Sequence, residues 1–352
     1  MQRPLPLLAT AAAAAALFAT APAHSQSSVT LSGLLDAYMG SMRLAGADDR
    51  VTHLGSGGMT TSWWGLRGTE DLGGGLSATF ALTGFMRVDT GSLGRFDGDP
   101  SFSRDANIGI SGGFGTVKLG RFAAPNFLPT IVINPFGDSF TFSPLVLHAN
   151  VNTPAWAHRT TPSDTGWANQ IGYTTPNFGG LTATLQYQLG EQTGDSRRNV
   201  GMNVMYASGP WSAVAYYERD QISNPVNPSP LTTNVNGVAV PETKTTWMVG
   251  GAYNPGFAKF YLTFGRAGAD VADYNARTIS GGVSIPVGAG MILAAVARTK
   301  VEGSYDGTRT TGSIGYDYFL SKRTDLYAVF MQDRISHLNT GNSFGVGLRH
   351  RF

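Results

Sequence analysis

The chain has 352 residues, of which only 14% are charged, and its 25 Lys and Arg nearly balance its 23 Asp and Glu. A soluble domain carries roughly a quarter of charged residues, and nucleic-acid binding needs a basic patch or stripe, so this balance argues against nucleic acid as a partner. Because the chain has no cysteine, disulfides cannot stabilise it.

The first 25 residues have the features of a secretory signal peptide. Arg3 gives a short positive start, residues 5–21 form an apolar run rich in alanine, and small residues precede a cleavage position after Ser25. A membrane anchor is the alternative, which the prolines in and around this run disfavour. We expect residues 1–25 to be removed and residues 26–352 to fold as one domain, because no linker divides them.

Apolar and polar residues alternate along most of the mature chain. Clear examples are residues 181–189, 211–218, 258–265 and 311–318. A period of two predicts β-strands with one apolar and one polar face. Strands of about 9 to 11 residues are long enough to cross a bilayer at a tilt, whereas no stretch approaches the roughly 20 apolar residues of a membrane helix.

Short turns rich in glycine and proline alternate with longer polar connections. The short turns are predicted at residues 71–75, 112–115, 176–180, 208–210, 254–256, 286–288 and 320–322, and the longer connections include residues 40–60, 89–101, 122–165 and 221–243. About sixteen antiparallel strands follow, joined as in an outer-membrane barrel. A soluble β-sandwich is the alternative, but low charge and aromatic residues at the strand ends favour a membrane interface. We therefore predict an all-β fold, a transmembrane antiparallel β-barrel.

Several motifs in this pattern resemble Gram-negative general diffusion porins of the β-proteobacterial type. They are SVTLSGLLDA at 28–37, WGLRGTEDLGGGL at 64–76, GFGTVKLGR at 113–121, YDYFLSKRTDLYA at 316–328 and FGVGLRHRF at 344–352. The resemblance implies a homotrimer of barrels in outer-membrane lipid, with the third loop folded inward to narrow each pore. It also implies passive diffusion of ions and small hydrophilic solutes, with no cofactor. The C-terminal Phe352 resembles the signal by which the barrel-assembly machinery recognises its clients.

Residues 122–165 are predicted to form the constriction loop. A connection this long inside a compact domain needs a functional reason. The tip of the loop consists of Asn134, Pro135, Phe136, Gly137 and Asp138. The family has a glutamate at this tip; here Asp138 is the only acid between Phe122 and Ser163, and the loop is otherwise apolar and aromatic.

In the family, the wall facing this loop carries a ladder of arginines. By resemblance, Arg104 matches one of them, Trp63 stands at a second position and Trp167 falls near a third. Because side chains alternate along a strand, Trp63 and Arg67 share the lumen face while Trp64 faces outward. The pore-lining residues that we expect are Trp63, Arg67, Arg104, Lys118, Trp167 and Asp36.

Pore selectivity follows the sign of the lining charges and the pore width. Because tryptophan in place of arginine removes positive charge, we predict only a weak anion preference. Two alternatives remain open. One is a channel specific for aromatic or amphipathic solutes, which would stack on Trp63 and Trp167; the other is a surface adhesin barrel that binds through long outer loops such as residues 221–243.

The same alternation assigns other polar residues to a face. If Arg104 points into the lumen, the opposite face of residues 102–111, with Asp105 and Asn107, points outward. Lipid penalises polar groups, so this face would be a subunit interface. Further expected lumen cations are Arg87, Arg298, Arg349 and Arg351, and further lumen acids are Glu218 and Asp317.

No catalytic or metal-binding motif stands out. Residues 109–113 match Gly-x-Ser-x-Gly, but they join two predicted strands where the nucleophile motif joins a strand to a helix. The six histidines show no pair at metal-ligand spacing. We therefore predict no enzymatic activity and no bound metal.

Overall fold

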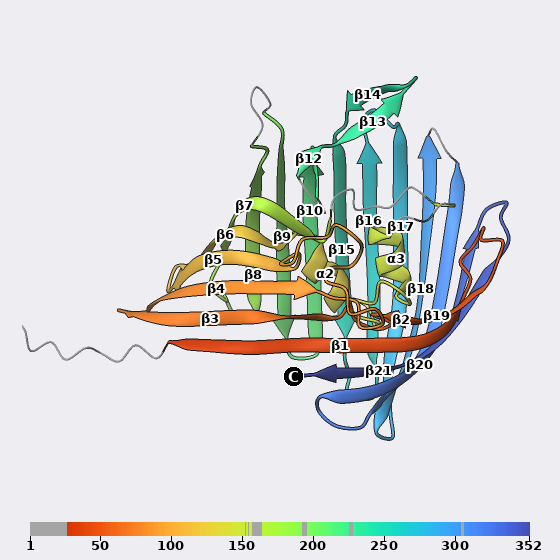
Figure 1. The fold of residues 1–352 in the computed structure, drawn as a ribbon, viewed down its shortest axis with the longest axis horizontal. Coiled ribbons are helices and arrows are strands. Elements are labelled where there is room, and N and C mark those ends of the chain that lie inside the picture. The colour runs from red at the N-terminus through yellow and green to blue at the C-terminus, as the bar shows by residue number, and fades with distance from the viewer. Residues whose placement is uncertain are drawn as a thin grey trace, which may run out of the picture.

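Antiparallel strands close into a barrel in the computed structural model (Figure 1). The structure describes residues 27–151, 153, 155–156, 164–191, 196–224, 228–303 and 306–352. The predicted signal peptide, residues 1–25, lies outside these described residues.

The elements of the barrel and its loops have the following bounds. The main sheet contains β1 (Ser28–Met42), β2 (Val51–Ser56), β3 (Trp63–Gly73), β4 (Leu76–Phe85), β5 (Asp105–Gly112), β6 (Gly115–Ala123), β7 (Gly166–Thr174), β8 (Leu181–Leu189), β9 (Arg198–Ser208), β10 (Trp211–Asp220), β15 (Lys244–Tyr253), β16 (Lys259–Ala269), β17 (Tyr274–Val287), β18 (Gly290–Gly303), β19 (Gly307–Phe319), β20 (Thr324–Ile335) and β21 (Gly341–Arg351). In one outer loop β11 (Ile222–Ser223) pairs with β12 (Ser229–Pro230), and β13 (Thr232–Val235) pairs with β14 (Val238–Pro241). The third loop contains the helices α2 (Phe127–Val132) and α3 (Pro144–Asn150).

The first and last strands pair and so close the wall. Leu34 of β1 lies opposite Arg351 of β21, and Ser41 lies opposite Phe344. Within the described ranges the main sheet has 17 strands. Because β2 and β3 follow one another along the same partner, β1, they form one interrupted wall strand, which leaves 17 − 1, or sixteen. The predicted antiparallel barrel is confirmed.

Short turns join the strands at one end of the barrel, as predicted. Between β3 and β4 the chain turns through Gly73, Gly74 and Gly75, which have φ values of 79°, 63° and 79°. These glycines have open space around them, so their positive φ angles, which disfavour other residues, explain why glycine is needed. The longer loops lie at the opposite end, which is the extracellular end of such barrels.

The two faces of the wall differ in burial. In β17 and β18 the outward-facing Ile279 and Val296 are 51% and 49% exposed, whereas the inward-facing Ser280 and Ala297 are 4% and 0% exposed. Outward apolar side chains of this kind form the lipid-facing band of a membrane barrel. Among the described residues no helix has both the length and the apolarity to cross a membrane.

The third loop folds into the barrel and packs on the inner wall, as predicted. Phe136 and Phe142 of the loop are almost fully buried in a cluster with Tyr38 of β1, Tyr327 of β20 and other wall residues. The short helices contact different wall strands, α2 on β9 and β10 and α3 on β17 to β19. The loop therefore fills one side of the lumen and leaves a passage along the other.

Two polar contacts fix these helices to the wall. The backbone and side-chain nitrogens of Asn126, directly before α2, both donate to Oε1 of the buried Glu218 at 2.7 Å. In α3 the ring nitrogens of His148 each lie 2.8 Å from a threonine hydroxyl, that of Thr299 on β18 and that of Thr311 on β19. These side chains are all buried, so each contact satisfies polar groups that water cannot reach.

Candidate functional site

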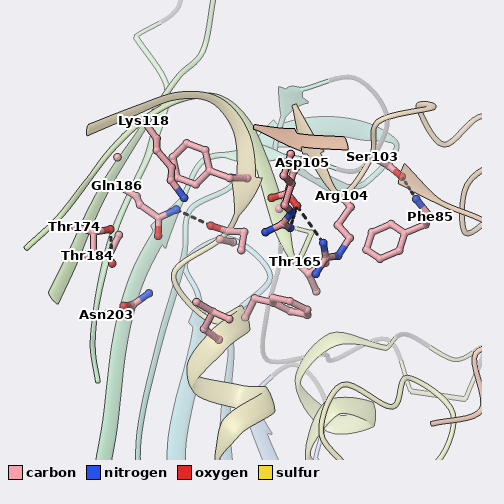
Figure 2. Close-up of a pocket in the computed structure, with 18 residues that line it drawn as sticks. Phe85, Ser103, Arg104, Asp105, Lys118, Thr165, Thr174, Thr184, Gln186 and Asn203 are labelled. Carbon is pink, nitrogen blue, oxygen red and sulfur yellow. Dashed lines mark hydrogen bonds and ion pairs between the residues drawn. The ribbon is translucent and has the colours of Figure 1, made fainter. Parts of the chain in front are cut away.

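A cavity of about 260 Å³ lies between α2 and the wall strands at the constriction (Figure 2). Arg67 of β3, Asp105 of β5 and Lys118 of β6 line it, together with Arg104 directly before β5. Gln186 of β8 donates to the backbone oxygen of Ala123 at 2.7 Å and also lines the cavity. Three cations thus lie on one stretch of wall.

The ring of Trp63 lies beside two of these cations. The guanidinium carbon of Arg104 is 4.0 Å from the ring centroid, and that of Arg67 is 5.9 Å away. Both distances permit a cation–π contact. The tryptophan therefore holds a guanidinium against its face, and this geometry does not leave Trp63 as an open stacking surface for solutes.

One carboxylate joins the two arginines. Oδ2 of Asp105 accepts from Nη2 of Arg67 at 2.8 Å, from Nη1 of Arg104 at 3.2 Å and from the hydroxyl of Thr83 at 2.7 Å. The Arg67 side chain is 48% exposed and that of Asp105 is 17% exposed. Water in the passage therefore meets the guanidinium more than the carboxylate behind it.

A second cationic group lies along the neighbouring wall. Arg349 pairs with Asp325 at 2.9 Å and with Asp317 at 3.0 Å, and Arg351 pairs with Asp325 at 3.2 Å. The Arg351 side chain is 45% exposed, whereas that of Asp325 is 1% exposed. Leu34 lies opposite both Trp63 and Arg351, so the two groups are separated by one strand.

The loop side of the passage is mostly apolar. Leu128 and Val132 of α2 are 44% and 37% exposed, and Leu128 lines the cavity. The loop also carries Asp138, directly after its tip. Burial raises the pKa of Asp138 above its ordinary value, and a hydrogen bond with Thr60 and the charge of Arg349 offset part of this rise. A cationic wall thus faces the apolar α2, and the charge of Asp138 is felt by Arg104 and Arg349 on the wall side.

The tip of the loop is ordered by its own asparagine. Oδ1 of Asn134 accepts from the backbone nitrogen of Phe136 at 2.9 Å, and its Nδ2 donates to the backbone oxygen of Gly137 at 2.9 Å. Pro135 lies against the wall at Gly282 of β17, where an added Cβ would be 2.8 Å from the proline ring. The tip is therefore seated on the wall, and Asp138 follows it.

The prediction that Asp36 lines the pore requires a correction. Its side chain is fully buried, because the segment between β2 and β3 folds over it. The backbone nitrogens of Gly58, Met59 and Thr60 donate to its carboxylate at 3.1, 2.8 and 2.8 Å, and the Tyr327 hydroxyl also donates to it. Asp36 anchors this segment on the lumen side and does not contact the open passage.

Trp167 also requires a correction as a pore-lining residue. It is 0% exposed, and the edge of its ring lies against Gly201 of β9, where Pro125 of the loop also packs. The loop thus covers this tryptophan against the wall. With Trp167 enclosed and Trp63 held by Arg104, the two rings do not form the stacking surface that an aromatic-specific channel would use.

The structure reverses the predicted faces of residues 102–111. Asp105 and Asn107 face the lumen, since Asp105 pairs with Arg67 and lies opposite the buried Thr83, while Ile108 is 60% exposed on the outer face. The reason is that β5 begins only at Asp105, so Arg104 precedes the strand and does not follow its alternation. The polar subunit interface predicted from that face is therefore wrong.

Other predicted lumen charges have different places. Arg349 and Arg351 face the lumen, and Glu218 and Asp317 are lumen-side but buried at 0% and 6% exposure. Arg298 is on the outer face, opposite the exposed Ile279 of β17. Asp325 is not among the predicted lumen residues. The β20–β21 register places it opposite Arg349, and only that register could have identified it.

Among the described residues no group of three or more His, Asp or Glu is placed to hold a metal ion. The outer face of β21 carries the alternating apolar residues that precede Phe352, with Phe344, Leu348 and Phe352 each exposed. Recognition of Phe352 by the barrel-assembly machinery stays a prediction.

Comparisons with known proteins agree with this architecture. The profile of the Gram-negative porin family matches residues 9–338. Outer membrane porin protein 32 of Delftia acidovorans is 34% identical over 325 residues, covering 90% of this chain and 86% of that protein. An outer membrane porin protein of Bordetella pertussis is 30% identical over 409 aligned residues, covering 97% of this chain and 98% of that protein.

A solved structure shares the whole fold. The anion-selective porin from Comamonas acidovorans superposes with a TM-score of 0.75 at 29% sequence identity, over 93% of this chain and 100% of that one. The fold, the inward third loop and these matches over nearly the full length lead to one identification. The chain belongs to the Gram-negative porin family and is a β-barrel porin of the outer membrane.

Proposed function

We propose that ions and small hydrophilic solutes diffuse through this porin with a weak preference for anions. The observation that carries the preference is the unequal exposure of its ion pairs. Arg67 is 48% exposed beside an Asp105 at 17%, and Arg351 is 45% exposed beside an Asp325 at 1%. The charges that permeating ions meet are therefore mainly positive, and lining charge sets selectivity.

The preference is expected to be weak because acids compensate most of the cations. Arg67, Arg104 and Lys118 line the cavity together with the acid Asp105, and the charge of Asp138 also acts on Arg104. With both acids ionised, the formal sum is 3 − 2, or +1. The likeness to a solved porin described as anion-selective supports the same sign.

We further propose that the protein assembles as a homotrimer and acts without enzymatic chemistry. The strands β5 and β6 are short, with 8 and 9 residues, whereas β17 and β18 have 14 each and β1 has 15. These short strands carry exposed apolar side chains such as Ile108 and Leu119, so a neighbouring subunit would cover them well. Crosslinking of the purified protein in mild detergent would test this stoichiometry.

The test of selectivity is the reversal potential of the purified porin in a planar bilayer under a potassium chloride gradient. We expect the wild type to favour chloride modestly. The double variant Arg67→Gln, Arg351→Gln should move the reversal potential toward potassium, because among the described residues it removes the two most exposed paired cations that face the lumen. The matched control is Lys322→Gln, Arg323→Gln, which removes two exposed cations from a short turn outside the lumen.

Three outcomes would contradict the proposal. A wild-type preference for potassium would mean that the exposed cations do not set selectivity. An equal shift in the control would assign the effect to overall charge. A folded barrel with no conductance would favour the adhesin alternative over a diffusion channel.

A further inference from the structure

Arg104, the cation that lies against Trp63, precedes the strand at the constriction. It is the last residue of the second loop, residues 86–104, and β5 begins one residue later. Its backbone nitrogen donates to the backbone oxygen of Thr83 at 3.2 Å, but the ladder between β5 and β6 begins only at Ala106. The position of this cation therefore depends on what holds the end of the second loop.

Three segments of the chain meet at the carboxylate of Asp164. This residue belongs to the third loop and directly precedes Thr165, which lines the cavity. Its two oxygens accept from Nη1 and Nη2 of Arg95 in the second loop at 2.6 and 3.0 Å. Oδ2 also accepts from Nη2 of Arg121 on β6 at 2.7 Å. Because a two-point contact between arginine and carboxylate fixes both groups in orientation, Asp164 joins the second and third loops to the wall.

A β-bulge gives Arg121 its direction. By alternation along β6, Arg121 would share the outer face of Leu119, which is 49% exposed. The register of β6 with β7 shifts between Gly120 and Phe122, and a bulge of this kind re-aims the side chain at its centre. Arg121 is accordingly buried, and its guanidinium lies between the two loops.

Arg121 continues the contacts as far as Arg104. Its Nε donates to the backbone oxygen of Ser103 at 2.6 Å, and Ser103 directly precedes Arg104. Both of these residues line the cavity (Figure 2). A short series of contacts thus runs from the carboxylate of Asp164 through the guanidinium of Arg121 and the backbone of Ser103 to Arg104.

The charges of this network cancel. Asp99 accepts from the backbone nitrogen and Nε of Arg95 at 2.9 and 2.8 Å, and its side chain is 0% exposed. Arg95 and Arg121 together with Asp99 and Asp164 sum to 2 − 2, or zero, formal charges. The network therefore adds no net charge to the passage, and its effect on ions must act through the position of Arg104.

We propose that Asp164 is a positioning residue of the pore, which with Arg95 and Arg121 fixes Arg104 at the constriction without contacting permeating ions itself. The electrical consequence rests on the proposed anion preference, whereas the positioning does not. A guanidinium held in one place acts on every passing ion from that place. Once released, Arg104 moves with the second loop, and its mean distance from the passage increases.

The position of Arg104 can be read from fluorine NMR of the folded porin in detergent, labelled with 5-fluorotryptophan. The ring of Trp63 lies 4.0 Å from the Arg104 guanidinium carbon, and Trp63→Phe assigns its signal among those of the six tryptophans. The double variant Arg95→Gln, Asp164→Asn keeps the net charge. We expect it to move the Trp63 signal toward the position found in Arg104→Gln.

A second variant and a control complete the experiment. Arg121→Lys keeps the positive charge but loses the forked donor geometry between Ser103 and Asp164, so it should move the signal in the same direction. The matched control is Lys300→Gln, Glu302→Gln, which removes a 2.6 Å ion pair from the outer wall with no change in net charge. It should leave the Trp63 signal in place.

The reversal potential under a potassium chloride gradient gives the electrical consequence. Arg104→Gln should lower the chloride-to-potassium permeability ratio about threefold, which is the effect of one charge about 7 Å from the ion. The Arg95 and Asp164 double variant should lower it by part of that amount, although its net charge is unchanged.

Two results would overturn the proposal: a Trp63 signal that stays in place in both network variants, or an equal movement of this signal in the control. A signal that moves as expected, with no change of the ratio even in Arg104→Gln, would confirm the positioning. It would then be the proposed anion preference that fails.

Discussion

Replacing Asp105 with asparagine should increase the anion preference of the pore. Asp105 is the shared partner of Arg67 at 2.8 Å and of Arg104 at 3.2 Å. Asparagine keeps an oxygen that can accept from Thr83 and from one arginine, but it removes the negative charge. The two guanidinium groups would then act on permeating ions without compensation.

The size of the effect follows from one added positive charge. An ion that passes about 7 Å away in water interacts with it by about 0.6 kcal/mol. Salt of about 0.1 M reduces this to roughly half. Because the charge attracts chloride and repels potassium by equal amounts, the permeability ratio should rise about threefold toward chloride.

The assay is the reversal potential in a planar bilayer under a potassium chloride gradient. The control is Asp97→Asn, because Asp97 also pairs with an arginine but is 95% exposed in an outer loop. The Asp97 pair is exposed, and such pairs contribute about 0–1 kcal/mol to stability, whereas asparagine in place of the half-buried Asp105 keeps an acceptor oxygen for Thr83. Both variants should therefore fold. The reasoning fails if the ratio of Asp105→Asn stays at the wild-type value, moves toward potassium or moves no further than that of the control.

Two further predictions concern the seating of the third loop, and both are read from guanidinium unfolding of the refolded protein in detergent. Burial lowers the pKa of His148 to about 3 from about 6.5, so between these pH values the folded state binds fewer protons than the unfolded state. The free energy of unfolding should therefore fall as pH drops below about 6.5, by about 2 kcal/mol at pH 5. His148→Gln should lose this part of the pH dependence, and a variant with the same pH profile as the wild type would contradict the assignment. Glu218→Ala should lower the free energy of unfolding by roughly 1–3 kcal/mol because it leaves the buried backbone nitrogen of Asn126 without an acceptor. Glu218→Gln keeps an acceptor oxygen and should lower it less. Equal losses in the two variants would show that the contact with Asn126 does not contribute to stability.

The wall of the barrel could be predicted from the sequence because its rules are local. Alternation along a strand assigns faces, and three glycines with positive φ between β3 and β4 mark a turn wherever they occur. The face of Trp63 and Arg67 could also be predicted, since both belong to one unbroken strand. Periodicity of two needs no knowledge of distant residues.

The site could be predicted only in part. Where a strand begins and which segment covers a side chain both depend on residues that are distant in the sequence. Asp105 was assigned to the wrong face because the strand begins one residue after Arg104. Asp36 lies on the predicted face, but the segment between β2 and β3 covers it. Trp167 is enclosed by the loop that packs on it. In each case the sequence pattern gives a direction, whereas exposure depends on what another segment places above the residue.

The geometry around Trp63 suggests why a tryptophan suits this position on the wall. Arg104 and Arg67 already share a single carboxylate, so a third guanidinium between them would add repulsion that Asp105 cannot compensate. The ring instead lies 4.0 Å from the Arg104 guanidinium carbon, a contact that contributes about 0.5–1 kcal/mol at an exposed site without adding charge. The tryptophan therefore orients Arg104 toward the passage while keeping the local sum of charge low. The constriction can thus hold its cations in fixed positions and still have a small net charge. A weakly anion-selective diffusion pore requires this combination.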